Sequence, residues 1–229
     1  MRNSLKLKNR FPLLISLLIT IPLLISNFYF YQKSQRLEKP FTVREVIDGD
    51  TFVLDSGQRV RLRAIYAPEL DLCGGPQAKE ELEDLILGKT VRLEEIIYDS
   101  YGRSLALVYL NETLVNEIML RQGWARFDGN KNSKSEALKD AYQIGREEKK
   151  GIFSSLCHQE ENLENLQCSI KGNIDKETDV KTYHFLGCRE YSATIVELDL
   201  GDQWFCTEKE AQDAGFKKSE NCFGKTFKP

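Results

Sequence analysis

Hydrophobic and polar residues alternate through the middle of the chain in a pattern that predicts strands first. Residues 41–54 (FTVREVIDGDTFVL) are rich in β-branched and aromatic side chains, and residues 48–50 interrupt them as a turn or bulge between two strands would. Arg59 to Ile65 alternates with a period of two, while 89–97 and 104–110 have strand character on either side of a polar turn. The pattern therefore predicts a group of short strands joined by tight turns.

Helical spacing follows these strands in three places. Pro76 to Leu87 carries apolar residues at helical intervals, and Gly88 stands where it can end the helix. Residues 114–122 and 135–148 predict two more helices. The order of strands, helix, strands and two helices favours an α+β fold, a five-stranded OB-fold-like barrel capped by about three helices, over a βαβ fold.

The N-terminus has a different character. Residues 1–10 are basic, and residues 11–31 then run without a charge. A helix of about twenty such residues covers the hydrocarbon core of a bilayer, so we expect a short cytoplasmic segment, a transmembrane signal-anchor at 11–31 and an extracytoplasmic remainder at the cell membrane. A cleaved signal peptide, which would release a secreted protein, is the alternative. Residues 32–40 are predicted to be a linker.

The polar segment 158–167 (HQEENLENLQ) is predicted to be a second linker. It separates a central domain, residues 41–157, from a small cysteine-bearing unit at 168–222, which residues 223–229 follow as a tail. The small unit is predicted to be an α+β domain that needs covalent cross-links, because a chain of this size buries little core. A cross-linked unit with a solvated surface is the favoured interpretation, and contact with a polymer through Lys171-Gly172-Asn173 and exposed aromatic residues is the alternative.

The chain contains six cysteines, an even number that predicts three disulfides in an oxidising compartment. Cys73 and Cys157 stand at the two ends of the helical part of the central domain and are expected to pair. For the rest, Cys168 with Cys222 and Cys188 with Cys206 is the preferred pairing of three possible ones. Zinc bound by His184, Cys188 and neighbouring cysteines is the alternative, although no CxxC pair is present.

Charge limits the possible modes of nucleic-acid binding. The formal net charge is -3, and the hydrophobic fraction of 41% is that of an ordinary globular protein. A polycationic nucleic-acid-coating protein is therefore excluded, and any such binding must come from a few placed cations.

Five short motifs occur in an order and at separations that together resemble the thermonuclease (staphylococcal nuclease-like) family over residues 41–157. They are Val46-Ile47-Asp48-Gly49-Asp50-Thr51, Arg61-Leu62 followed by Ala67-Pro68-Glu69, Tyr101-Gly102-Arg103, Leu114-Val115-Asn116-Glu117 and Arg121-Gln122-Gly123-Trp124-Ala125.

The resemblance implies a metal-dependent nuclease that hydrolyses phosphodiester bonds of DNA, RNA or both, with Ca²⁺ as cofactor. Metal and arginine groups suit this chemistry because negative charge develops on the phosphate. It implies the following roles: Asp50 and the backbone carbonyl of Ala67 as metal ligands, Arg61 and Arg103 as phosphate-binding residues, Glu69 as the carboxylate that activates water, and Tyr101 as a substrate-binding residue.

One position departs from the family. Tyr66 stands three residues before Glu69, where the family has a second metal-binding aspartate. A phenol is protonated near neutral pH and is a poor ligand for Ca²⁺, so we expect a weakened or altered nuclease. The alternative is an inactive module that binds single-stranded nucleic acid or a protein partner at the cell surface, although nothing in the sequence indicates a protein partner.

Overall fold

The computed structural model describes residues 20–28 and 40–227 of the chain. Two compact units are distinguished, Met1–Pro40 and Phe41–Pro229, and each is treated by itself. In the first unit, residues 20–28 form a short helix with exposed side chains, while the rest of the predicted 11–31 span, the segment 1–10 and nearly all of the linker 32–40 lie outside the described residues. Among the described residues, no helix has the length and apolar character to cross a membrane.

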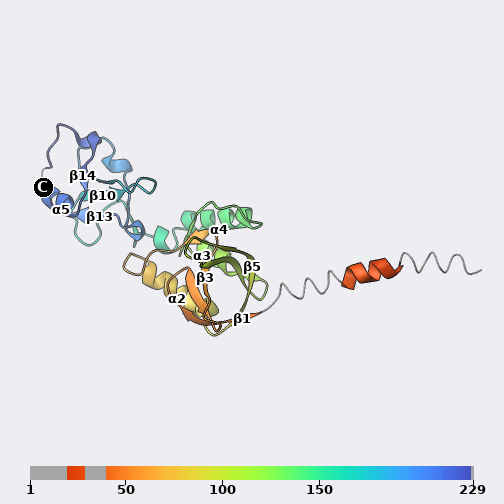
Figure 1. Ribbon diagram of the computed structural model, residues 1–229. Coiled ribbons are helices and arrows are strands. Elements are labelled where there is room, and N and C mark those ends of the chain that lie inside the picture. Colours follow the sequence, from red (N-terminus) through yellow and green to blue (C-terminus); the bar gives the residue numbers. More distant parts are fainter. Residues whose placement is uncertain (1–19, 29–39, 228–229) are drawn as a thin grey trace, which may run out of the picture. The chain divides into compact units, whose positions relative to one another are not determined.

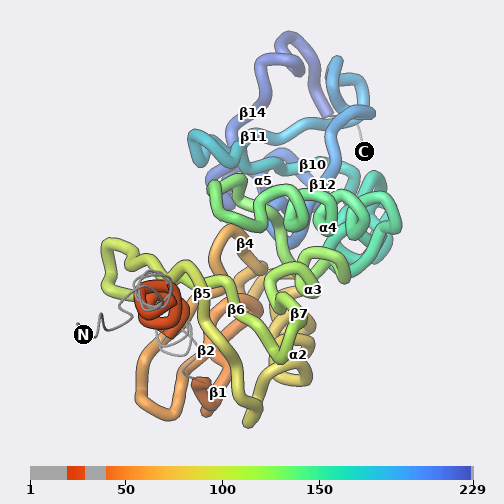
Figure 2. The backbone as a smooth tube through the Cα atoms, turned by 90° about the vertical axis from the view of Figure 1, so that its right-hand side faces the viewer, coloured from red at the N-terminus to blue at the C-terminus, as the bar shows by residue number. Residues whose placement is uncertain are grey.

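The second unit begins with a closed five-stranded barrel (Figures 1 and 2). Strand β1 pairs antiparallel with both β2 and β5, β2 pairs with β3, and β5 pairs with β6. A parallel pairing of β3 with β6 closes the ring. The strands are β1 (Phe41–Val46), β2 (Thr51–Leu54), β3 (Arg59–Leu62), β5 (Thr90–Tyr98) and β6 (Ser104–Leu110). The predicted OB-like barrel is therefore confirmed.

Three helices pack against this barrel, as the periodicity predicted. They are α2 (Gly75–Ile86), α3 (Val115–Arg121) and α4 (Ser135–Glu147). Their apolar faces join the strands in a single core. Short elements complete the domain: β4 (Ile65–Tyr66) pairs with β8 (Arg126–Phe127), β7 (Thr113–Leu114) pairs with β6, and a 3-10 turn, Gly151–Phe153, follows α4.

Asn116 is a polar residue of α3 whose side chain is buried against the barrel. It is fully buried, its side-chain oxygen accepts a hydrogen bond from the Val108 amide at 2.9 Å, and its Nδ2 donates to the Arg63 carbonyl at 2.9 Å. A buried amide with partners on β6 and on the turn after β3 fixes the helix on the barrel, since leaving either partner unsatisfied is costly.

The predicted bridge between Cys73 and Cys157 is present, with a Cα–Cα distance of 5.6 Å and a sequence separation of 84. It ties the segment that leads into α2 to the segment after the 3-10 turn.

Replacing both Cys73 and Cys157 by serine is expected to lower the free energy of unfolding by about 3–5 kcal/mol, because the open chain regains loop entropy on unfolding. Urea denaturation of the oxidised proteins measures the loss. The Cys188→Ser/Cys222→Ser variant opens a shorter span of 34 residues and serves as the comparison. A loss below about 1 kcal/mol would show that the bridge does not constrain the unfolded chain as the entropic model requires.

The C-terminal module, residues 158–227, has its own sheet in the order β13-β10-β11-β14, on which α5 packs. The predicted linker begins with a strand, β9, which pairs antiparallel with β12. Tyr183, Phe185 and Phe216 are the largest side chains of the module's core. The elements are β9 (His158–Gln159), β10 (Ile170–Ile174), β11 (Lys181–His184), β12 (Val196–Glu197), β13 (Gln203–Phe205), α5 (Glu208–Asp213) and β14 (Lys217–Lys218).

The predicted disulfide pairing in this module was wrong. Cys168 bonds to Cys206, and Cys188 bonds to Cys222. The sheet order is the physical reason: β10 and β13 are neighbours, which brings the residue before one strand to the residue after the other, and β14 lies parallel to β11, so the segments that follow both strands meet. All four thiols are used in these bonds, so the zinc alternative is also wrong.

Candidate active site

Asp50 lies in the turn between β1 and β2 and is only 3% exposed. Its Oδ1 accepts a hydrogen bond from the Thr51 hydroxyl at 2.8 Å, and its Oδ2 accepts from the Ala67 amide at 3.0 Å and from an Arg61 nitrogen at 2.8 Å. The turn is pressed against its surroundings, because a Cβ on Gly49 would meet the Cβ atoms of Ala67 and Ala78 at 2.6 Å. Glycine is therefore required there for the close approach that brings Asp50 to the Ala67 backbone.

The Asp50 carboxylate is electrostatically under-compensated. Burial raises its pKa to about 6 from an ordinary value of 3.8, and the Arg61 guanidinium offsets only part of that effect. The charge of Asp48 works in the same direction as burial. A second cation beside Asp50 would favour its ionised form.

Arg61 reaches Asp50 because of strand register. Thr51 pairs with Arg61 across β2 and β3, which places the arginine beside the turn that carries Asp50. The side chain of Arg61 is 27% exposed, so part of it is accessible to solvent while it pairs with the buried carboxylate of Asp50.

Arg103 lies just before β6, the strand that pairs with β3. The Asp99 side chain holds it through an Nε–Oδ2 contact of 2.7 Å, and this bond raises the pKa of the guanidinium further. Arg61 pairs with Leu105 across β3 and β6, which brings Arg103 near the strand that carries Arg61, and the charge of Asp50 also raises the pKa of Arg103. Among the described residues, no hydrogen bond is made by the two terminal nitrogens of Arg103, which leaves them available to an anion.

Tyr101 is 83% exposed, and the Arg103 guanidinium lies 5.4 Å from the centre of its ring. Together with Gly102, Gln58 and Arg59, these residues line an open hollow of about 520 Å³. An exposed aromatic ring beside two arginines suits a nucleotide, whose base can stack while its phosphate is bound.

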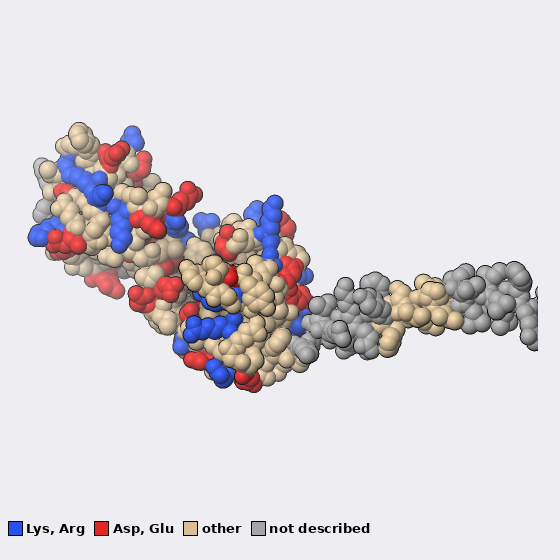
Figure 3. All heavy atoms as spheres, viewed as in Figure 1, with Lys and Arg blue, Asp and Glu red and all other residues tan. Residues whose placement is uncertain are grey.

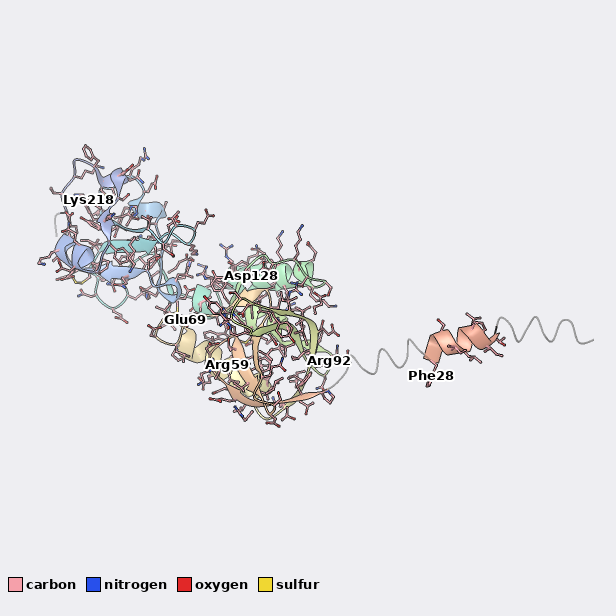
Figure 4. The ribbon with its side chains drawn as sticks, in the orientation of Figure 1. Phe28, Arg59, Glu69, Arg92, Asp128 and Lys218 are labelled. Carbon is pink, nitrogen blue, oxygen red and sulfur yellow. A yellow bond between two sulfur atoms is a disulfide. The ribbon has the colours of Figure 1, made fainter. Side chains whose placement is uncertain are left out.

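Glu69 lies in the loop between β4 and α2, where Figure 4 labels it, and its side chain is exposed. Within the described part of the chain its carboxylate makes no hydrogen bond or ion pair, whereas its backbone carbonyl accepts from the Leu72 amide at 3.0 Å. A Cβ on Gly75 would lie 2.0 Å from that carbonyl oxygen, so the loop passes against the start of α2. The backbone of Glu69 is thus fixed while its side chain is available to solvent.

Tyr66 is half-buried beside β8. Burial raises the pKa of the Tyr66 hydroxyl, and the charges that act on it are those of Arg126, Asp199 and Glu197. Tyr66 is the cross-strand partner of Arg126, and side chains opposite each other in such a pair lie on the same face. Where the family has a carboxylate, this chain therefore has a neutral ring next to Arg126.

The structure brings Asp50, Arg61 and Arg103 together, and it places Tyr101 beside Arg103. Ala67 contacts Asp50 through its amide, while Glu69 follows on the same loop without touching the arginines. Sequence reasoning missed Asp99, which orients Arg103. The turn 99–103 contained the signal, since an aspartate that opens such a turn commonly accepts hydrogen bonds from the amides that follow it.

Lys and Arg are mixed with Asp and Glu over the described residues on the face seen in Figure 3. This agrees with the small net charge of -3. Anion binding therefore depends on the few arginines of the site and not on a broad basic surface.

Comparison with known proteins gives the same family as the motifs. The staphylococcal nuclease homologue model matches residues 59–155. An uncharacterized endonuclease of Haemophilus influenzae is 36% identical over 121 residues, covering 51% of this chain and 64% of that protein. An uncharacterized endonuclease of Escherichia coli O157:H7 is 34% identical over 118 residues, covering 49% and 75%.

A micrococcal nuclease of Shigella flexneri is 38% identical over 95 residues, 36% of this chain and 55% of that enzyme. The chain spans less than two thirds of several of these relatives, including 22% of an uncharacterized 38.1 kDa protein of Capnoides sempervirens. Since it covers three quarters of the Escherichia coli protein at 34% identity, and its barrel carries the motifs in place, the chain belongs to the staphylococcal nuclease family.

Proposed function

We propose that this protein is a nuclease that hydrolyses phosphodiester bonds of DNA, RNA or both. The observation that carries the proposal is the ion pair between the buried Asp50 and the partly exposed Arg61, together with Arg103, which lines an open hollow with Tyr101. A phosphate needs this combination, because two guanidinium groups bind its oxygens more strongly as negative charge develops in the transition state.

Each residue then has a role. Arg61 and Arg103 bind the phosphate, and Asp99 orients Arg103 by holding its Nε at 2.7 Å. Tyr101 stacks on a neighbouring base. The exposed carboxylate of Glu69 positions the attacking water and accepts its proton, which a carboxylate without a competing partner can do.

The site has one buried carboxylate, that of Asp50, which suits a divalent cation. Asp50 is buried with its pKa raised to about 6, so a positive charge in addition to Arg61 would be favoured beside it. Asp50 and the carbonyl of Ala67 would hold the ion, with the substrate and water as the remaining ligands. Ca²⁺, the family's metal, would supply neutralisation of the phosphate charge. Among the described residues, no three His, Cys, Asp or Glu side chains are grouped as a metal site.

The test is a cleavage assay of the oxidised full chain in mild detergent, with single-stranded DNA and RNA. Cleavage is measured with Ca²⁺, with Mg²⁺ or Mn²⁺, and with chelator. Cleavage that requires a divalent ion is the expected result. Tight oligonucleotide binding without turnover would favour the second candidate, a binding module, which Tyr66 at the ligand position specifically supports.

Replacing Tyr66 by aspartate is expected to strengthen Ca²⁺ binding by about tenfold or more, because affinity in oxygen sites follows the number of charged ligands. Calorimetric titration of the protein with Ca²⁺ measures the change. Tyr66→Phe removes only the hydroxyl and is the matched control, expected to leave the affinity unchanged. Equal affinities in all three proteins would mean that position 66 does not reach the ion.

Export to an oxidising compartment is part of the proposal, and three disulfides support it. Anchoring in the membrane through residues 11–31 remains a prediction from the sequence.

A further inference from the structure

A buried group of charges joins the barrel domain to the C-terminal module. Arg126 of β8 is 5% exposed and Asp199 is 2% exposed. Arg126 donates from Nε to Asp199 Oδ2 at 2.8 Å and from Nη2 to Asp199 Oδ1 at 3.0 Å, a two-point contact. Its Nη2 also donates to Glu197 Oε1 at 2.9 Å. Removing either partner of such a buried ion pair leaves the other charge buried and unpaired, which strongly destabilises the fold.

Arg126 is next to the segment that carries the proposed catalytic carboxylate. It pairs across β4 and β8 with Tyr66, and Phe127 pairs with Ile65. The chain runs directly from Tyr66 to Ala67, whose amide bonds to Asp50 at 3.0 Å, and on to Glu69. Asp199 therefore holds Arg126 in place, and Arg126 is the cross-strand partner of Tyr66 at the start of this segment.

The other end of the same segment is also connected to the module. Cys73 follows Glu69 by four residues and is bonded to Cys157. The Cys157 carbonyl accepts a hydrogen bond from the Leu198 amide at 2.8 Å. Residues 197–199 of the module thus contact both ends of segment 66–73 indirectly. They bind Arg126, which pairs with Tyr66 at the start of the segment, and Cys157, which is bonded to Cys73 at its end.

We infer that Asp199 of the C-terminal module is a positioning residue for the barrel's catalytic segment, acting through Arg126 on the backbone of residues 66–69. The inference rests on the proposed nuclease function for its catalytic consequence. It gives the accessory module a specific role: the module completes the support of Glu69 and of the Ala67–Asp50 contact. Catalysis is sensitive to such support, because misplacing a group by about 1 Å can cost a hundredfold in rate.

The experiment compares the oxidised full chain with its Asp199→Asn variant, in which the side-chain shape is kept and the negative charge removed. Hydrogen–deuterium exchange reports on the segment without reference to activity. Exchange of the amides in 66–72 is expected to accelerate by about fivefold or more, with β5 and β6 unchanged. For cleavage of single-stranded DNA, kcat is expected to fall about tenfold while KM stays within twofold, because Asp199 acts on the catalytic segment and does not bind the substrate.

Two further variants complete the design. Arg126→Lys keeps the charge but loses the two-point contact, so it is expected to shift exchange and kcat in the same direction by less. Asp213→Asn removes an exposed carboxylate that pairs with Lys209 on α5 of the same module, and is expected to change neither.

Unchanged exchange in 66–72 would overturn the inference. So would faster exchange spread evenly through the barrel, because that would show general destabilisation. If exchange rises only in 66–72 while no protein cleaves, wild type included, the positioning of the segment is supported and the proposed reaction is refuted.

Discussion

Replacing Arg103 by alanine is expected to reduce kcat for cleavage by roughly a hundred- to a thousandfold, the cost of removing one charged donor from a developing oxyanion. The structure gives the reason. Asp99 occupies only Nε of Arg103, so both terminal nitrogens remain for the phosphate. Arg61, by contrast, already shares its charge with Asp50. Steady-state kinetics on single-stranded DNA measure the loss.

Two companion variants make this result specific. Arg103→Lys is expected to recover little activity, because an ammonium cannot make the two-point contact of a guanidinium. Arg121→Ala removes an arginine that pairs with Glu117 on α3, outside the site, and should cleave like the wild type. A loss below about threefold in Arg103→Ala would remove this arginine from the proposed mechanism.

Replacing Asp50 by asparagine is expected to change activity and stability in opposite directions. An amide loses the charge that a cation and Arg61 require, so cleavage should fall by roughly a hundredfold or more. The hydrogen bonds can persist, since the amide oxygen can accept from Arg61 and Ala67 and the amide nitrogen can donate to the Thr51 hydroxyl. Removing a buried charge should meanwhile stabilise the metal-free protein near pH 7.5.

The pH dependence of the Asp50 effect has a definite sign. Because the folded-state pKa is about 6 and the unfolded value about 3.8, the folded protein binds more protons between these values. This group's contribution therefore lowers stability as pH rises from about 4 to 6, by on the order of 3 kcal/mol. Urea denaturation in chelator at pH 4.5 and 7.5 compares wild type with Asp50→Asn. A variant less stable than the wild type at pH 7.5 would mean that the Asp50–Arg61 attraction exceeds the burial cost.

The sequence predicted the barrel well because its elements are local. Strand alternation and helical spacing located the start of β3 and both ends of α4 within one residue, although β3 ends three residues earlier than predicted. The meeting of Asp50 with Arg61 followed from the family motifs, and the short β2–β3 hairpin fixes it physically.

The contacts that were not predicted depend on tertiary arrangement. Cys168 meets Cys206 only because β13 joins β10, and no spacing along the chain reveals which strands become neighbours. Arg126 and Asp199 are 73 residues apart in sequence, and no motif connects them. Their burial follows from the packing of the module on the barrel, which periodicity cannot indicate.

The Cys73–Cys157 bridge also affects the cellular compartment in which the proposed nuclease could be active. The loop that follows Glu69 is closed by a bond that a reducing cytosol does not permit. Under the proposed export, the thiols would be free before export and the segment less constrained, so the newly made chain is expected to be a poor catalyst beside the cell's own chromosome. Oxidation outside the cytosol would then act as a maturation step, and the cell would be protected from its own nuclease without a separate inhibitor.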